Sequence, residues 1–104
     1  MSKASRDKGK RGEREFAALL RSFGYEARRG VQYSGGADSP DIVTELPFHF
    51  EVKRVEKLNI HDAYKQAEGD AEKFTPVVAH KRSRCRWFVT LLAEDFLGLL
   101  NEKK

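Results

Sequence analysis

The fold is decided by the stretch Pro40-Asp41-Ile42-Val43-Thr44-Glu45-Leu46-Pro47-Phe48-His49-Phe50-Glu51-Val52-Lys53, which contains two strand-like runs around a turn. In residues 48–53 apolar and polar side chains alternate, and an extended strand places alternate residues on opposite faces. The two resulting faces are an apolar one with Phe48, Phe50 and Val52 and a polar one with His49, Glu51 and Lys53. We expect strands at residues 41–44 and 48–53, joined as a hairpin by a turn at residues 45–47.

Amphipathic helices are predicted before and after these strands. In residues 12–23 apolar residues recur at the helical spacing, and Gly24 follows as a stop signal. These apolar residues are Phe16, Leu19, Leu20 and Phe23. A second helix is predicted at residues 62–74, although Gly69 weakens it by roughly 1 kcal/mol. Its apolar stripe consists of Tyr64, Ala67, Ala71 and Phe74.

Three further strands and a closing helix complete the pattern. We expect strands at residues 25–29, 76–80 and 87–91, a Gly-rich loop at 30–39, and a helix at 93–100. The order α-β-β-β-α-β-β-α is typical of an α/β domain with a mixed central β-sheet flanked by helices. A chain of 104 residues is the size of one domain. We therefore assign residues 9–104 to a single domain and residues 1–8, which have nothing to bury, to a flexible basic arm.

The charge balance favours a polyanionic partner. The chain has 20 Lys and Arg against 16 Asp and Glu, a net charge of +4 and a pI near 9.3. The residues that we expect to contact such a partner are Lys8, Lys10, Arg11, Arg14, Arg28, Arg29, Arg54, Lys81, Arg82, Arg84 and Arg86. A solvated charged surface is the alternative interpretation of each basic cluster.

Cysteine content and hydropathy exclude several classes of protein. Cys85 is the single cysteine, which excludes an intrachain disulfide and a zinc site built from several cysteines. The N-terminus lacks the apolar core of a signal peptide, and no apolar run approaches membrane-spanning length. We therefore expect a cytoplasmic protein without a membrane partner.

Asp41, Glu51 and Lys53 are the candidates for chemistry. Hydrolysis of a phosphodiester requires a metal ion that polarises the phosphoryl oxygen and generates hydroxide near neutral pH. Asp41 and Glu51 lie in neighbouring predicted strands, so their carboxylates can converge on Mg²⁺. Lys53 shares the face of Glu51, and its ammonium can orient the attacking water or stabilise charge on the phosphate. The alternative is that Glu51 and Lys53 form the solvated face of an edge strand.

Glu13 is a further candidate, in the first predicted helix. At about 100° per residue it lies roughly 60° from the middle of the apolar face, whereas Glu15 lies roughly 100° away. Glu13 therefore points nearer to the body of the protein. The alternative is that it stabilises the helix N-terminus through the helix dipole. His49 shares the face of Glu51, which makes a position next to the metal ligands one interpretation of this residue.

Four motifs, in order, resemble a known family. They are Gly9-Lys10-Arg11-Gly12-Glu13-Arg14-Glu15, Ser34-Gly35-Gly36, Pro40-Asp41-Ile42-Val43 and Glu51-Val52-Lys53. Together they resemble the archaeal-type Holliday junction resolvases and their phage and prophage relatives, a branch of the PD-(D/E)XK nucleases. The resemblance covers residues 8–57 in motif detail and continues more loosely through the second helix and the last two strands.

The resemblance implies a restriction-endonuclease-like core with a site for Mg²⁺ or Mn²⁺. The implied metal ligands are Glu13, Asp41, Glu51 and Val52. The implied catalytic residues are Glu13, Ser34, Asp41, Glu51, Lys53 and Gln66. Gln66 resembles the helix glutamine of other PD-(D/E)XK branches, and a polar surface position is its equal alternative. The chain departs from the family in its short segment after the last strand, where resolvases often build part of a dimer surface.

The function predicted from these features is that of a metal-dependent DNA endonuclease acting on branched DNA. A homodimer would match the approximate two-fold symmetry of a four-way junction. The candidate dimer anchors are Trp87, Phe88, Phe96 and Leu100, with ordinary core packing as the alternative for each. Two other functions stay open: a nuclease that nicks or trims other DNA structures, and a non-catalytic DNA-binding module on the same fold.

Overall fold

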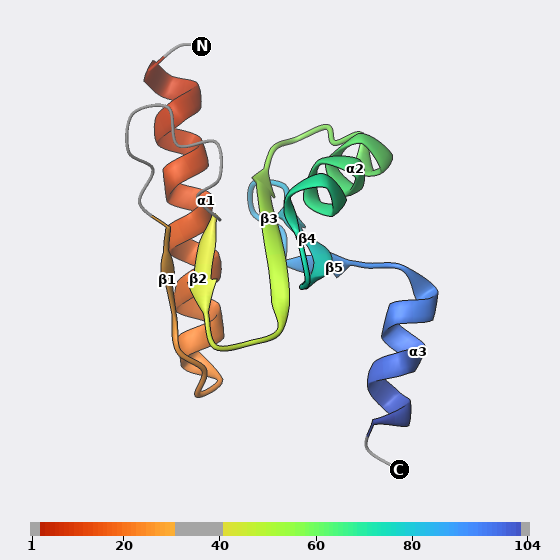
Figure 1. Cartoon of the computed structure of the whole chain (residues 1–104). Coiled ribbons are helices and arrows are strands. Elements are labelled where there is room, and N and C mark those ends of the chain that lie inside the picture. Colours follow the sequence, from red (N-terminus) through yellow and green to blue (C-terminus); the bar gives the residue numbers. More distant parts are fainter. Residues whose placement is uncertain (1–2, 31–40, 103–104) are drawn as a thin grey trace.

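The computed structural model describes residues 3–30 and 41–102, with side chains described from Gly9 onward in the first helix. In chain order its elements are α1 (Lys3–Ser22), β1 (Ala27–Arg29), β2 (Ile42–Thr44), β3 (Phe48–Arg54), α2 (Ile60–Asp70), β4 (Thr75–Lys81), β5 (Phe88–Thr90) and α3 (Ala93–Asn101). The predicted order of helices and strands is confirmed (Figure 1). The predicted loop, from residue 31 onward, lies outside the described residues.

The strands form two groups. β3 and β4 pair in parallel, from Phe48 opposite Thr75 to Arg54 opposite Lys81, while β4 and β5 pair antiparallel. The sheet β3-β4-β5 is therefore mixed, as predicted, and α2 is the kind of crossover that two parallel strands require. β1 and β2 form a separate antiparallel pair next to α1 (Figure 1).

The predicted hairpin between residues 41–44 and 48–53 is wrong. β2 pairs with β1 and β3 pairs with β4, so within the described ranges no ladder joins β2 to β3. A side chain links them instead, because the backbone N–H of Val52 donates to Oδ2 of Asp41 at 2.9 Å. The carboxylate of Asp41 thus takes the place of the carbonyl that a hairpin partner would offer to Val52.

Two hydrophobic clusters lie on opposite faces of β4. Val77 and Ala79 belong to the main core beneath α1, where the ring of Phe16 lies 5.0 Å from that of Phe50. Val78 faces the other way and packs against buried alanines of α2. Because neighbouring residues of a strand face opposite sides, one strand brings both helices onto the sheet.

The helices begin and end at different residues from those predicted. α1 begins at Lys3, so residues 3–8, predicted as a flexible arm, are helical. Lys, Ala and Arg favour a helix without needing burial, which explains the difference. α2 spans Ile60–Asp70 rather than residues 62–74. Asn59 caps its start by accepting from the N–H of Asp62 at 3.1 Å, and Glu72, with a φ of 52°, follows its end.

Two aromatic residues assigned to helix stripes lie beyond the helices. α1 ends at Ser22 and Gly24 adopts a φ of 93°, which leaves Phe23 74% exposed. Phe74 follows the end of α2 and is 42% exposed. In both places a residue of positive φ turns the chain before the periodic pattern is complete.

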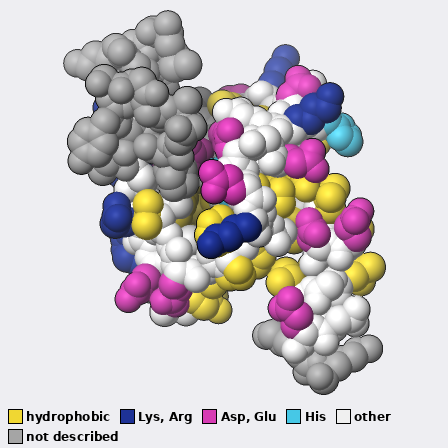
Figure 2. All heavy atoms as spheres, in the orientation of Figure 1, with side chains coloured by type: hydrophobic (Ala, Val, Ile, Leu, Met, Phe, Trp, Pro, Cys, Tyr) yellow, Lys and Arg dark blue, Asp and Glu magenta, His cyan; other side chains and the backbone are white. Residues whose placement is uncertain are grey.

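The C-terminal helix α3 contains no buried residue. Among the predicted dimer anchors, Trp87 packs against the main core, with its ring 5.2 Å from that of Phe16. Phe88, Phe96 and Leu100 are 62%, 51% and 50% exposed. Figure 2 shows hydrophobic side chains at the surface around α3. Neither α3 nor any other helix in the described ranges is long and apolar enough to cross a membrane.

Gly12 sets the distance between α1 and β3, and replacing it by Ala should destabilise the fold. A Cβ at Gly12 would lie 2.9 Å from Cβ of Arg54, which no side-chain rotation can relieve. We expect Gly12→Ala to lower the free energy of unfolding by about 1–2 kcal/mol.

The matched control is Gly9→Ala in the same helix, where an added Cβ meets nothing within 4 Å. This control should gain about 0.5–1 kcal/mol, since Ala favours a helix. Urea unfolding measures both, and equal effects would contradict the close approach.

Candidate active site

The polar face of β3 is turned toward α2. Glu51 is only 6% exposed, although β3 is an edge strand of its sheet. Nζ of Lys53 lies 3.4 Å from Oε2 of Glu51 and donates to Oε1 of Gln66 on α2 at 3.2 Å. A solvated edge side chain would be exposed, so that interpretation is wrong for Glu51. Gln66 is exposed, and its contact with Lys53 links α2 to this face of β3.

Asp41 precedes β2 and reaches the edge of β3. Its Oδ2 accepts the hydrogen bond from Val52, the residue after Glu51. Burial raises the pKa of Asp41 above its ordinary value, and the hydrogen bond from Val52 and the charge of Lys53 offset part of this rise. The local fold thus draws the carboxylate of Asp41 toward that of Glu51.

Glu51 has a strongly raised pKa. Burial is the main cause, and the negative charge of Asp41 raises the pKa further. The charge of Lys53 and its hydrogen bond lower the pKa, which comes to about 7. Ionised Glu51 is therefore costly to the fold near neutral pH unless a cation offsets its charge.

The raised pKa of Glu51 predicts a pH-dependent gain in stability for Glu51→Gln. Between about 4.3, the ordinary pKa of Glu, and about 7 the folded state binds more protons than the unfolded state. The contribution of Glu51 to stability is therefore lost as pH rises through this window, by on the order of 3 kcal/mol. We expect Glu51→Gln to raise Tm at pH 8 in EDTA and to leave it nearly unchanged at pH 4.5. Glu94→Gln on exposed α3 controls for the loss of one negative charge; an equal gain at both pH values would contradict the assignment.

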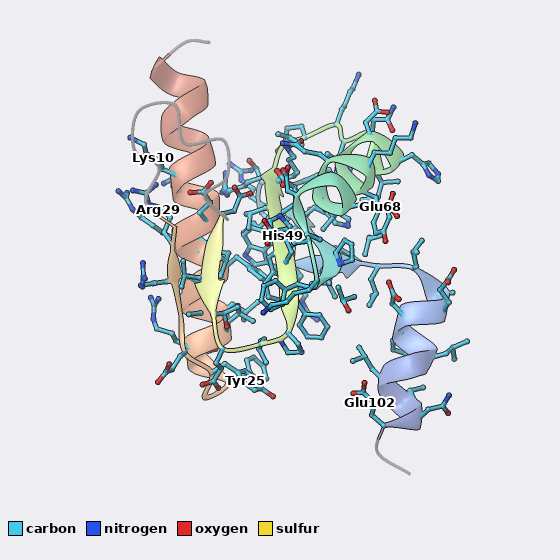
Figure 3. All side chains as sticks on the ribbon, viewed as in Figure 1. Lys10, Tyr25, Arg29, His49, Glu68 and Glu102 are labelled. Carbon is cyan, nitrogen blue, oxygen red and sulfur yellow. The ribbon has the colours of Figure 1, made fainter. Side chains whose placement is uncertain are left out.

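Glu13 approaches the same acidic groups from α1. Nη1 of Arg29 on β1 donates to its Oε1 at 3.5 Å. Burial and the negative charge of Asp41 raise the pKa of Glu13, while Arg29 and Lys10 lower it. Figure 3 shows Lys10 and Arg29 on the same side of the molecule, near α1 and β1. Because α1 begins at Lys3, Glu13 lies well beyond the first turn, and the helix-dipole interpretation is wrong.

The carboxylates of Glu13, Asp41 and Glu51 have the oxygen chemistry that a divalent cation takes, although their ligand atoms do not all lie within 4.8 Å of one another. Each has a raised pKa, and the charge of Asp41 contributes to the shift of the other two. Negative charges gathered at partly buried positions are costly unless a cation offsets them. Carboxylate oxygens are the ligands that Mg²⁺ and Mn²⁺ prefer.

A second group of metal-ligand side chains lies on the same face of β3. His49, Glu51 and Asp70 each offer one ligand atom, and these atoms lie within 4.8 Å of one another. Among the described residues, this is the group of three whose ligand atoms lie that close together. Asp41 is not a member of it. The alternation of β3 predicts that His49 lies beside Glu51, whereas Asp70 was not predicted to belong to the site. The sequence offered no signal for Asp70, because the helix was predicted to continue to residue 74 and its end at Asp70 appears only in the structure.

Glu15 connects α1 to the sheet, a role that the sequence analysis missed. Its carboxylate lies 3.8 Å from Arg11, 3.3 Å from Arg54 and 3.5 Å from Lys81. The side chains of Arg54 and Lys81 are only 13% and 16% exposed. Both were predicted to bind DNA, and in the structure both form ion pairs with Glu15. The parallel register that sets Arg54 opposite Lys81 creates this cluster, and the sequence pattern does not reveal it.

Most other predicted DNA-binding residues lie at the surface. The exposed ones are Lys10, Arg11, Arg14, Arg28, Arg82, Arg84 and Arg86. Arg29 is partly buried against Glu13. The last three of the exposed group lie between β4 and β5, in the gap between the strands predicted at residues 76–80 and 87–91. The side chain of Lys8 and the whole of Ser34 lie outside the described residues.

A mixed sheet between helices, with Asp41 beside an edge strand that carries Glu51 and Lys53, is the architecture of the PD-(D/E)XK nuclease class. The chain belongs to the family described as "Phage putative PDDEXK endonuclease", whose model matches residues 4–104. Among solved structures, it is similar to Hjc, a Holliday junction resolvase from the archaeal hyperthermophile Archaeoglobus fulgidus. That likeness has a TM-score of 0.60 and 29% identity, over 81% of this chain and 72% of that chain. No curated protein matches the chain.

Proposed function

We propose that the protein is a DNA endonuclease that depends on Mg²⁺ or Mn²⁺ and acts in the cytoplasm. The observation that carries the proposal is the pair of acidic residues Asp41 and Glu51, both with raised pKa values, beside the ammonium of Lys53. A module that only bound DNA would gain nothing from partly buried acids next to a polyanion. Membership of an endonuclease family supports the same conclusion.

Each residue of the site has a proposed role. Asp41, Glu51 and the backbone carbonyl of Val52 would hold the ion, with Glu13 as a further ligand. When bound, the ion supplies stabilisation of negative charge on the phosphate and lowers the pKa of water that it coordinates. Lys53 donates to the attacking water or to a phosphate oxygen. Gln66 positions Lys53, and Ser34 is carried over as a catalytic residue from the motif resemblance alone.

The proposed substrate is branched DNA, which the likeness to a Holliday junction resolvase supports. The test compares labelled linear, flap and four-way DNAs of equal length, with and without Mg²⁺, under single-turnover conditions. We expect the four-way junction to be cut fastest and to compete best for the protein. Equal rates on all DNAs would favour a nuclease that nicks or trims other structures. Tight binding of DNA without cleavage in Mg²⁺ or Mn²⁺ would favour the non-catalytic module.

The proposed assembly is a symmetric homodimer that places two active sites on opposite strands of a junction. An apolar groove of about 420 Å³ supports it, bordered by Phe23, Phe48, Val89 and Phe96. Phe88 and Leu100 are also exposed but do not border this groove, and Phe88 borders a separate hollow with His80 and Ile60. Light scattering at micromolar concentration, alone and with junction DNA, tests the assembly. A monomer in both conditions would remove the resolvase interpretation and favour a nickase.

Phosphate contacts should dominate DNA affinity, with contributions from residues 1–8 and from the basic segment between β4 and β5. Each neutralised phosphate releases counterions, so affinity should fall steeply as salt rises. Deletion of residues 1–8 removes Lys3, Arg6 and Lys8 together with Asp7. We expect this deletion to lower the magnitude of the slope of log affinity against log salt by about 1–3. Fluorescence anisotropy measures the slope, and an unchanged slope and affinity would show that this segment does not contact DNA.

A further inference from the structure

A histidine and two carboxylates converge between β3 and the end of α2. His49 and Glu51 stand two residues apart on β3, so they share one face of the strand, and Asp70 is the last residue of α2. Their ligand atoms lie within 4.8 Å of one another. Figure 3 labels His49 on β3. The site is open to solvent, because Asp70 is exposed and His49 is only partly buried.

The side chains of His49 and Asp70 have no other structural role within the described ranges. Neither makes a side-chain hydrogen bond or an ion pair with any described residue, although both lie close to Glu51. Their ligand atoms are near enough to share an ion, and among the described residues no hydrogen bond joins His49 to either carboxylate. Asp70 also lies where a carboxylate opposes the helix dipole, so its position does not stabilise α2.

The surrounding charges favour a cation at this place. The negative charge of Asp70 raises the pKa of both Asp41 and Glu51, so three carboxylates repel one another around β3. Lys53 is a nearby positive group, and its Nζ lies 3.4 Å from Oε2 of Glu51. Lys53 offsets part of the negative charge of Asp41 and Glu51, and a divalent ion between Glu51 and Asp70 would offset more of it.

We propose that His49, Glu51 and Asp70 form a second cation site, which takes a first-row transition-metal ion. Imidazole is a ligand for Mn²⁺, Co²⁺, Ni²⁺ and Zn²⁺, whereas Mg²⁺ prefers oxygen ligands and water. The site differs in chemistry from the all-oxygen set around Asp41. Glu51 belongs to both sites. That Glu51 is shared rests on the proposed function, whereas the existence of the second site with His49 and Asp70 does not. The protein would then have two neighbouring metal sites whose different ligands prefer different ions.

Calorimetric titration with Mn²⁺, in the absence of DNA, tests the second site. Asp41→Asn provides the background, because it removes a ligand of the first site and leaves His49, Glu51 and Asp70 in place. We expect Asp41→Asn to retain one Mn²⁺ site, and the addition of His49→Gln or Asp70→Asn to weaken that site at least about tenfold. Glu68→Gln is the matched control, since Glu68 is an exposed acid on α2 outside the group. Unchanged binding after both His49→Gln and Asp70→Asn would overturn the proposal.

The ring nitrogen resonances of the wild-type protein provide a test that needs no variant to fold. One equivalent of Zn²⁺ should shift a ¹⁵N resonance of the His49 ring, and a large excess of Mg²⁺ should not reverse the shift. His61 and His80 serve as internal controls, because neither belongs to the group. A His49 resonance that Zn²⁺ leaves in place would overturn the proposal. A shifted His49 in a protein that fails to cut DNA would refute the proposed function and leave this site standing.

Discussion

Asp41→Asn and Glu51→Gln should each abolish Mg²⁺-dependent cleavage while DNA affinity stays equal or rises. Loss of a group that only orients a metal ligand costs up to about 100-fold, so loss of a ligand itself should exceed about 100-fold. DNA affinity is kept because each change also removes a negative charge near the phosphate backbone. Single-turnover cleavage and fluorescence anisotropy measure the two effects separately.

Both substitutions preserve the shape of the side chain, so a loss of cleavage can be attributed to the loss of the carboxylate. Asn at position 41 can still accept the hydrogen bond from Val52 that links β2 to β3. Gln at position 51 removes a carboxyl whose pKa is raised to about 7, so the fold should be kept at neutral pH. Glu45→Gln, in the exposed turn between β2 and β3, is the control for loss of charge alone. Retained Mg²⁺-dependent cleavage in both site variants would refute the site assignment.

Lys53→Ala should lower turnover by roughly 10²–10³-fold, as expected for the loss of one donor that stabilises transition-state charge. Metal binding should persist, because the carboxylates remain. The experiment belongs at pH 8.5, since Lys53 lowers the pKa of Glu51 and its loss would raise that pKa further above about 7. Single-turnover cleavage gives the rate, and calorimetry with Mg²⁺ gives the affinity.

The control for Lys53→Ala is Lys57→Ala, which removes an exposed lysine beyond the end of β3. Gln66→Ala is a useful comparison, because Gln66 accepts a hydrogen bond from Nζ of Lys53 at 3.2 Å. Its proposed role is to position Lys53, whereas the ammonium of Lys53 is proposed to contact the substrate. We expect a smaller loss of turnover there than in Lys53→Ala. Loss of metal binding in Lys53→Ala would mean that the role of Lys53 is structural.

Local patterns predicted the elements and part of the site. The alternation in residues 48–53 correctly separates Phe50 and Val52, which are buried in the core, from Glu51 and Lys53 on the face toward α2. This works because a strand has only two faces, and each residue's face follows from its number. The Glu51–Lys53 pair and the order of elements were therefore available from sequence.

Contacts between distant segments were not available in the same way. The pairing of β2 with β1 joins segments that lie apart in the sequence. The sequence pattern instead favoured a hairpin between β2 and β3, which does not form. The cluster around Glu15 depends on the register of β3 and β4, and the approach of Asp70 to His49 depends on where α2 ends. The end of α2 was missed because Glu72 adopts a positive φ, a backbone property that periodicity does not report. The stop predicted at Gly24 is confirmed, and its φ is 93°.

The most direct measurement of the central claim is a time course of a labelled four-way junction with the wild-type protein, first in EDTA and then after excess Mg²⁺ is added. A divalent ion held by Asp41 and Glu51 is the proposed cause of hydrolysis, so we expect bound but intact DNA in EDTA and cleaved strands after Mg²⁺. Gel electrophoresis separates the strands, and anisotropy confirms binding in both conditions. Cleavage that proceeds in EDTA, or DNA that stays bound and intact in Mg²⁺ and in Mn²⁺, would contradict the account.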